Sequence, residues 1–372
     1  MPDLRLKPVL AIVVALLVIY GFGTGGIFFI DDAPSMDGML AAGDGGGAAA
    51  YVLSGSAGPL GRPVALATFW LQRGAYVAGN ANPFLWVNMG IHLLNVLLLW
   101  WLALRLQRRL PQWLGRSPWL APAVAFLWGG MPVLASASLM IVQRMTTLSA
   151  LFALLGMHAY LWARTQAARG SWPGLLLALG ALGLCTLLSA LSKENGVLLP
   201  LLLLVLHGVL FGAPGQHAPE AAGQAAHPWL WRVLLASLCL PGAAVIGYMA
   251  AKVPTIAGTY WNRPFDLPER LASEAVILWE YLRVAFLPRL ADLSPFRDDY
   301  PIRHFSDGVV QLALAGWVLA LGAGAWLWWR GRPLLLFALL WYLAGHLLES
   351  GMFALFLYFE HRNYVPLMGP VL

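Results

Sequence analysis

The chain has 372 residues, of which 60% are hydrophobic and 11% are charged, and its mean hydropathy is +0.70. A soluble domain of this size carries about a quarter charged residues, so a water-soluble globular protein is excluded and a lipid bilayer is the expected surrounding. The net charge of +6 does not indicate nucleic-acid binding, because the basic residues lie at the ends of apolar runs rather than along one face.

Apolar runs follow one another along the chain, and a run of about 20 residues suffices to cross a bilayer. The first run, 8–30, is longer than a signal-peptide core and predicts a retained span. A run that begins at Pro366 is interrupted at Leu372, which predicts a truncated chain and about nine or ten spans in all. The runs between them lie near 83–104, 118–138, 146–163, 173–191, 196–212, 231–250, 309–329 and 334–357.

Basic residues set the expected orientation. They concentrate in short segments between the runs, and such segments face the cytoplasm. Most acidic residues then fall on the opposite side. The pattern predicts a multi-pass protein of a bacterial inner membrane with its chemistry on the periplasmic face. The basic segments are 1–7, 105–117, 164–172, 213–230 and 330–333.

Two long loops are expected on the periplasmic side of a single domain, 1–372. The first loop, 30–82, contains an amphipathic stretch, 64–77, which predicts a helix on the membrane surface. The second loop, 251–306, contains a helix over 269–288. We interpret that helix as interfacial or re-entrant, because a spanning helix would move the later polar motifs to the other side.

Asp31 and Asp32 follow the first span directly. Adjacent carboxylates repel, so such a pair either raises one pKa or binds hydroxyl donors or a cation. One carboxylate could act as a general base toward an acceptor hydroxyl. The alternative is a pair that caps and solvates the helix end.

Gln143 and Arg144 are polar residues next to an apolar run, where a charge is costly unless it is paired or hydrated. Arg144 either binds an anionic group such as a lipid phosphate or extends to the headgroups. Lys193 and Glu194 lie in a short polar break between two runs. They either act together or form a surface ion pair in a tight turn.

Arg263 lies in an aromatic segment, 260–265, of a kind that holds sugars or phosphates, or that forms an interfacial aromatic belt. His346 and Glu349, three residues apart in the expected last span, share a helix face. A satisfied pair inside the bundle is favoured over a metal site. Four polar residues follow that span beside the membrane core, an arrangement that is hard to explain as a simple turn. They are Glu360, His361, Arg362 and Asn363.

In order and spacing, six motifs of this chain resemble the polytopic GT-C glycosyltransferases. Within them, the chain looks most like the transmembrane tetratricopeptide-repeat O-mannosyltransferases and the bacterial pilin glycosyltransferases of the arabinosyl type. The resemblance extends over nearly the whole chain. The motifs are Asp31-Asp32, Gly61-Arg62-Pro63, Asn88 to Asn95, Val142 to Met145, Ser192 to Asn195, and Glu360 to Pro366.

The resemblance implies a helical GT-C bundle that transfers a sugar from a polyprenyl-phosphate donor to a hydroxyl of a protein, such as a pilin, or of a glycan or glycolipid. It implies that Asp31 or Asp32 is the base and that positive charge stabilises the leaving phosphate. No cofactor is expected, and a divalent metal is not favoured. The implied donor-binding residues are Arg62, Gln143, Arg144, Lys193, Glu194, Arg263, Glu360, His361 and Arg362.

The chain departs from these relatives in two places. Met131-Pro132 stands where relatives often have His-Pro, and no tetratricopeptide repeats are present up to Leu372. The alternatives are a transporter or flippase of lipid-linked glycans, an O-antigen ligase-like protein, and a scaffold with a decayed site. A transporter is disfavoured, because transporters place polar groups at mid-membrane, often on repeated halves. The polar motifs of this chain lie mostly at one membrane face, and its halves do not match.

Overall fold

The computed structural model describes residues 1–372 except 1–5, 43–46, 56, 216–225, 295–296 and 298. The described residues form helices and connecting segments, and no strand. The elements up to the middle of the chain are α1 (Leu6–Gly21), η1 (Ile30–Asp32), α2 (Ala33–Met36), α3 (Gly38–Ala41), α4 (Gly47–Val52), α5 (Pro63–Trp70), α6 (Arg73–Val77), α7 (Asn82–Arg109), α8 (Pro111–Leu114), α9 (Leu120–Gly129), η2 (Pro132–Leu134), α10 (Ala135–Leu139), α11 (Arg144–Ala168) and α12 (Trp172–Ser192). The later elements are η3 (Glu194–Leu198), α13 (Leu199–Val205), η4 (Leu206–Phe211), α15 (Pro228–Ile256), η5 (Ala257–Tyr260), α16 (Leu267–Phe286), η6 (Leu290–Asp292), α17 (Gly308–Trp329), α18 (Leu334–His346), η7 (Glu360–Asn363) and α19 (Met368–Val371).

Six helical segments in the described ranges are long and apolar enough to cross a membrane. The pair α9 and η2–α10, bent by 55°, adds a seventh if it counts as one span. This confirms the expected all-α membrane protein in its coarse form. The six are Asn82–Arg109, Arg144–Ala168, Trp172–Ser192, Glu194–Phe211, Pro228–Tyr260 and Gly308–Trp329.

The expected nine or ten spans are not all present at full length. The first, expected over 8–30, ends at Gly21, where a glycine-rich stretch begins and helix formation becomes unfavourable. The last, expected over 334–357, ends at His346. The break within 118–138 lies at Gly129-Gly130 and Pro132, because proline removes a helical hydrogen bond and clashes with the preceding turn.

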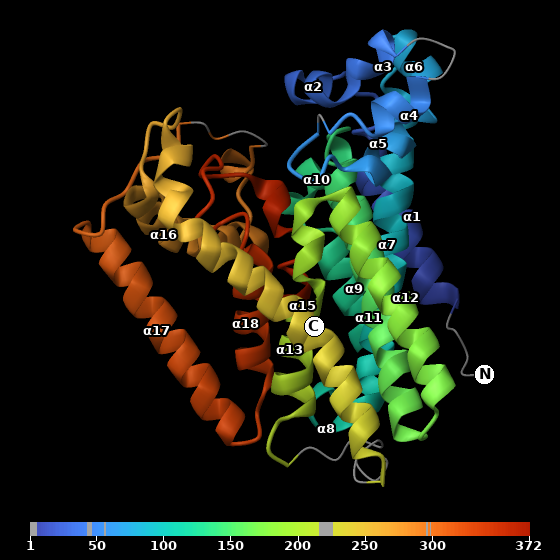
Figure 1. Ribbon diagram of the computed structural model, residues 1–372, viewed down its shortest axis with the longest axis vertical. Helices are drawn as coiled ribbons and strands as arrows, with labels where there is room; N and C mark the ends of the chain where they lie inside the picture. Colours follow the sequence, from blue (N-terminus) through green and yellow to red (C-terminus); the bar gives the residue numbers. More distant parts are fainter. Residues whose placement is uncertain (1–5, 43–46, 56, 216–225, 295–296, 298) are drawn as a thin grey trace.

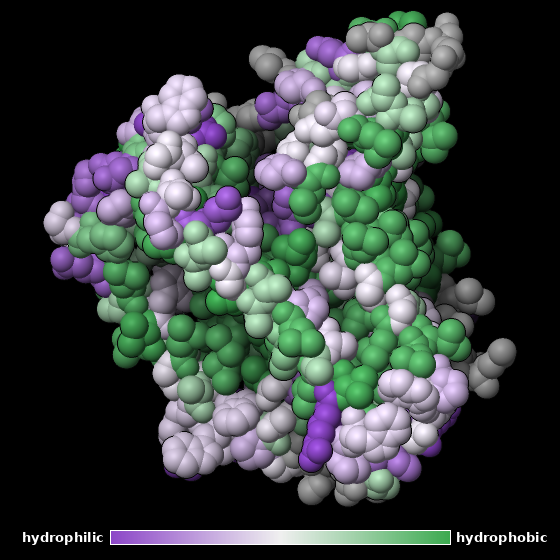
Figure 2. Space-filling view, in the orientation of Figure 1, coloured by the Kyte–Doolittle hydropathy of each residue, from purple (hydrophilic) through white to green (hydrophobic). Residues whose placement is uncertain are grey.

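Figure 1 shows how the elements are arranged. Helices α1, α7, α9, α11 and α12 stand together on one side, α17 and α18 lie on the other, and α15 runs obliquely between them. The short helices α2–α6 cover one end of the bundle, which we call the upper end. Figure 2 shows hydrophobic side chains across the middle of this face, as expected for a lipid-facing surface.

The loop 30–82 is packed onto the upper end. Apolar side chains from this loop form a separate buried cluster with the ends of α7 and α11. The helix expected over 64–77 is divided at Leu71-Gln72 into α5 and α6. Helix α5 starts with Pro63, a residue favoured in a first turn. The described parts of the loop are therefore packed beside the mouth of the bundle. The buried residues that this loop contributes to the cluster include Met36, Met39, Tyr51, Leu66 and Phe69.

Helix α16 corresponds to the helix expected over 269–288. Its start is fixed by a capping box, in which Asp266 Oδ1 accepts from the Glu269 N–H and Glu269 Oε2 accepts from the Asp266 N–H, both at 2.8 Å. It is not among the helices apolar enough to span. In Figure 1, α17 begins at the end of the bundle that α15 reaches, so the chain does not need α16 to cross. Its location at a membrane surface stays a prediction.

Candidate functional site

A cavity of about 1200 Å³ lies at the upper end of the bundle. Its walls come from the start of the loop 30–82, the entry to α11, the α12–η3 turn, α15 with η5, and the segment 348–362. Part of the lining is apolar, and we call this part the apolar wall; the rest includes charged side chains. The apolar wall includes Ala244, Val245, Tyr248, Phe353 and Phe356.

The cavity gathers most of the residues that the sequence singled out. They come from six separate places in the chain, which only the fold brings together. Three of the candidates, Asp32, Arg144 and Glu360, do not line it. Those that do are Asp31, Arg62, Gln143, Lys193, Glu194, Arg263, His361 and Arg362.

The two adjacent aspartates have different surroundings. Asp31 is exposed and lines the cavity. Asp32 is fully buried, and its carboxylate accepts the Phe29 N–H (2.7 Å) and the Val142 N–H (2.8 Å). Burial raises the pKa of Asp32, while these two hydrogen bonds oppose the rise. Asp32 therefore ties η1 and the residue before it to the entry of α11.

Arg144 is buried within the protein and away from the cavity. Its Nε donates to Asn88 Oδ1 (2.7 Å) and its Nη2 donates to the Phe84 carbonyl (3.0 Å). The guanidinium also lies over the rings of Phe69 and Phe84, at 4.9 and 5.3 Å. The N–H groups of the guanidinium thus bind α7, and its face packs on a ring of α5. Arg144 therefore joins α7, α11 and α5 together.

Lys193 and Glu194 pair with different partners rather than with each other. Lys193 Nζ lies 2.7 Å from Glu349 Oε1 and donates to Thr146 Oγ1 at 3.0 Å. Glu194 accepts from Arg62 Nη2 at 2.7 Å and Nε at 3.0 Å. The Lys193 pair is nearly buried, with side-chain exposures of 8% and 11%, whereas the Arg62 pair is about a quarter exposed.

Gly58 makes room for the Arg62–Glu194 pair. Its φ is +127°, and a Cβ atom there would lie 2.6 Å from Glu194 Oε1 and 3.0 Å from Arg62 Nε. Both conditions favour glycine, which has no Cβ and tolerates positive φ. The loop 30–82 is thus shaped to bring Arg62 against the α12–η3 turn.

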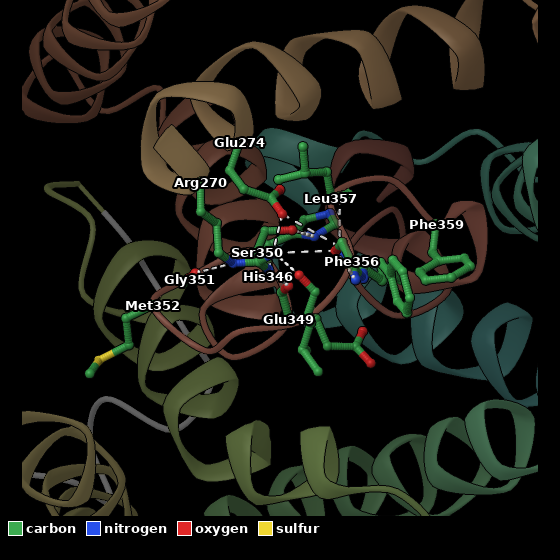
Figure 3. A network of polar contacts seen from close by, with 12 residues as sticks. Arg270, Glu274, His346, Glu349, Ser350, Gly351, Met352, Phe356, Leu357 and Phe359 are labelled. Carbon is green, nitrogen blue, oxygen red and sulfur yellow. Dashed lines mark hydrogen bonds and ion pairs between the residues drawn. The ribbon is translucent and has the colours of Figure 1, made fainter. Parts of the chain in front are cut away.

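A buried ionic cluster that includes Arg270 and Glu274 of α16 lies beside the segment that follows α18 (Figure 3). Glu274 lies 3.4 Å from Arg362 Nη1 and 3.1 Å from Arg270 Nη2. Arg270 donates to the carbonyls of Glu349, Gly351, Leu355 and Phe356.

Arg362 donates to the carbonyls of Phe356 and Leu357. Backbone without helical bonds must find other partners when it lies inside a membrane protein. The two guanidiniums therefore hold the segment after α18, 347–357, in the shape of a cavity wall.

The expected pairing of His346 with Glu349 on one helix face is wrong, because α18 ends at His346. His346 Nδ1 instead contacts Ser350 Oγ at 3.2 Å, and Glu349 contacts Lys193. Glu349 thus belongs to the cavity, which the sequence did not indicate. The contact of Glu274 with Arg362 is likewise not indicated by the sequence, since the two residues are 88 positions apart.

His361 and Glu360 point to different regions. His361 lines the cavity, and burial, followed by the charge of Lys193, lowers its pKa well below the usual value. Glu360 is 3% exposed and accepts the Ser294 N–H at 2.9 Å. Burial raises the pKa of Glu360 to about 7. Glu360 fastens the loop after η6 rather than lining the cavity.

Arg263 is fixed at the rim between α15 and the segment 347–357. Its Nε donates to the Ala354 carbonyl at 2.8 Å and its guanidinium lies 4.2 Å from the centre of the Phe356 ring. Tyr260 adds a second link by donating to the Met352 carbonyl at 2.7 Å. These links keep the apolar wall and the rim in one piece.

Among the described residues, no group of three or more His, Cys, Asp or Glu side chains is placed to hold a metal ion. No family model, curated protein or solved structure matches this chain. The functional argument below therefore starts from the cavity and its residues.

Proposed function

We propose that this protein is a membrane glycosyltransferase that moves a sugar from a polyprenyl-phosphate donor to a hydroxyl acceptor, a protein or a glycan, at the upper cavity. The upper end would then face the periplasm of a bacterial inner membrane. One observation carries the proposal: a single large cavity joins an apolar wall to a cluster of cations, with a carboxylate on its lining.

A polyprenyl-phosphate sugar has an isoprenoid chain, an anionic phosphate and a polar ring. The apolar wall on α15 and the segment 353–356 suits the isoprenoid chain. Only 22% of the apolar window of α15 is buried inside the protein, so this helix borders the lipid from which such a donor would enter. Arg62, Lys193 and Arg362 suit the phosphate, because cations stabilise the charge that develops on a leaving phosphate.

The reaction would be a direct displacement that inverts the anomeric carbon. The acceptor oxygen forms a bond to that carbon while the bond between the carbon and the phosphate oxygen breaks. The phosphate leaves with the electron pair, and the acceptor proton passes to the Asp31 carboxylate. A positioned base of this kind contributes roughly 10²–10⁴-fold to the rate.

We assign the base to Asp31 rather than Asp32. Both carboxylate oxygens of Asp32 accept backbone N–H groups, which occupies them in holding two segments together. Asp31 lines the cavity and is exposed to an incoming acceptor. Asp32 then acts on the reaction through the position of its neighbour.

The test is transfer of radiolabelled sugar from a polyprenyl-phosphate donor in membranes that contain the wild-type chain or Asp31→Asn. We expect Asp31→Asn to lower transfer about 10²–10⁴-fold while donor binding is kept. Asp37→Asn is the matched control, since Asp37 lies in the same loop and accepts from Tyr76 Oη at 2.5 Å.

A rate of sugar transfer by Asp31→Asn equal to that of the wild type would overturn the assignment of the base. Movement of the labelled donor across the membrane without sugar transfer, by the wild-type chain, would favour the flippase alternative instead.

A further inference from the structure

Three of the cations that line the cavity each contact a different carboxylate. Arg62 contacts Glu194 at 2.7 Å, Lys193 contacts Glu349 at 2.7 Å, and Arg362 contacts Glu274 at 3.4 Å. In the proposed function, these three cations bind the phosphate of the donor. An arriving phosphate therefore meets ion pairs.

The pairs have an evident benefit for the empty cavity. A buried charge without a partner costs several kcal/mol, and removing one partner of a buried pair is strongly destabilising. Lys193 and Arg362 have little exposure, so each needs a counter-charge when no ligand is bound. Stability alone would be served equally well by apolar side chains, so the pairs also invite a functional explanation.

The chemistry of the two phosphate species supplies that explanation. The donor is a phosphodiester with one negative charge, whereas the released lipid is a monoester with about −1.5 to −2 charges near pH 7. Excess positive charge in the cavity would hold the product more strongly than the donor. Carboxylates beside the cations weaken the attraction for both species, and the effect is larger for the more highly charged product.

We propose that Glu194, Glu274 and Glu349 are counter-ions that lower the affinity of the cavity for the polyprenyl monophosphate product and so promote its release. This inference rests on the proposed function and adds a control of turnover to it. The three residues are positioning and specificity-determining residues, since each acts through the cation that it contacts.

Glu349 is expected to have the largest effect. Its pair with Lys193 is nearly buried, at 8% and 11% side-chain exposure, so solvent screens it little. Glu194 belongs to a pair about a quarter exposed, and Glu274 is shared between Arg362 and Arg270. Each replacement by glutamine keeps the shape of the side chain and removes one negative charge.

The experiment measures equilibrium binding of a short-chain polyprenyl monophosphate to the full chain in detergent. Glu349→Gln should bind this probe about tenfold more tightly than the wild type, the size expected for one unscreened charge a few ångströms away. Its kcat for transfer should fall, because release of the product becomes slower. Glu194→Gln should change both quantities in the same direction by a smaller factor.

Two controls separate charge from damage to the fold. Glu280→Gln lies on the same helix as Glu274 and pairs with Arg297 at 2.7 Å, outside the cavity lining, so it should leave binding unchanged. The polyprenyl alcohol without phosphate should bind all variants equally. A protein damaged by substitution would bind the monophosphate more weakly, which is opposite to the expected sign.

Unchanged or weaker binding of the monophosphate by both Glu349→Gln and Glu194→Gln would overturn the counter-ion proposal, while the proposed function would stand if the wild type binds the probe and transfers sugar. If Glu349→Gln does not fold, the more exposed Glu194 decides the outcome. Absence of probe binding by the wild type and all variants would overturn both proposals.

Discussion

Basic residues occur at both ends of the bundle, and two kinds of contact can be compared among them. At the upper end, Lys193 and Arg362 contact carboxylates. At the lower end, Arg164 lies 3.7 Å from the centre of the Phe211 ring and 4.8 Å from that of Trp231. Arg105 there donates to the His158 carbonyl at 3.0 Å.

The difference separates cations that can exchange partners from cations that anchor. A carboxylate beside a cavity can be replaced at its cation by another anion, such as a phosphate. Rings and carbonyls of neighbouring helices cannot leave without disrupting the packing. Substitutions of cations that line the cavity should therefore change ligand binding and turnover, and substitutions of cations packed between helices should change stability.

Among substitutions of the basic residues, the largest expected effect is that of Lys193→Met on sugar transfer. Loss of one cation that stabilises the leaving phosphate should lower kcat about 10²–10³-fold. The matched control is Arg164→Met at the lower end, which should lower the melting temperature and keep the kcat of the folded fraction. Equal loss of kcat in both variants would contradict the separation of the two ends. Transfer rates and thermal unfolding of the purified proteins provide the measurements.

Arg144→Lys tests whether an upper-end cation away from the cavity acts as an anchor. A lysine cannot donate to both the Asn88 side chain and the Phe84 carbonyl as the guanidinium does. Each buried acceptor left without a donor should lower the free energy of unfolding by about 1–3 kcal/mol. We expect a lower melting temperature and an unchanged KM for the donor. A raised donor KM without loss of stability would return Arg144 to the binding residues.

The comparison also shows what the sequence could and could not predict. Hydropathy predicts most helices because a span needs a long apolar run, and the order of polar motifs led to most of the cavity residues. It could not predict the ion pairs, since Arg62 and Glu194 are 132 residues apart. The sequence also places Glu349 inside a helix. It could not predict that α18 ends at His346, because the carbonyls that follow are held by tertiary contacts such as that from Arg270.

The direction in which a side chain points was the second limit. Arg144 and Arg362 both lie beside apolar runs, and each directly follows a polar residue, Gln143 or His361. Only the packing shows that Arg144 turns toward the Phe84 carbonyl of α7 and that Arg362 lines the cavity. The same limit left Asp31 and Asp32 undecided, although the surroundings of the two carboxylates are very different.

Glu360 should make the stability of the upper end depend on pH. Its pKa of about 7 lies above the ordinary value of 4.5, so between these pH values the folded protein binds more protons than the unfolded chain. The free energy of unfolding should then fall as pH rises from about 4.5 to about 7, by on the order of 2 kcal/mol. Glu360→Gln should flatten this slope. An unaltered slope in thermal unfolding at several pH values would disprove this role.

The smallest expected effect is that of Asp266→Ala, which removes the capping box of α16. Loss of an N-cap costs about 1 kcal/mol. Because α16 carries Arg270 and Glu274, a loosened start should slightly raise the donor KM as well as lower the melting temperature. Asp266→Asn keeps a capping side chain and should behave almost as the wild type. Identical melting curves for the alanine and asparagine variants would show that the cap does not contribute.

Photocrosslinking tests the central claim most directly, that the upper cavity holds a polyprenyl-phosphate sugar. A donor with a photoreactive group on its isoprenoid chain would be irradiated with the full chain in membranes, and the labelled peptides identified by mass spectrometry. We predict labelling of the apolar wall, 244–248 on α15 and 353–356 after α18, that is lost when unlabelled donor competes. Competable labelling confined to the lower end, or labelling that unlabelled donor does not reduce, would contradict the claim.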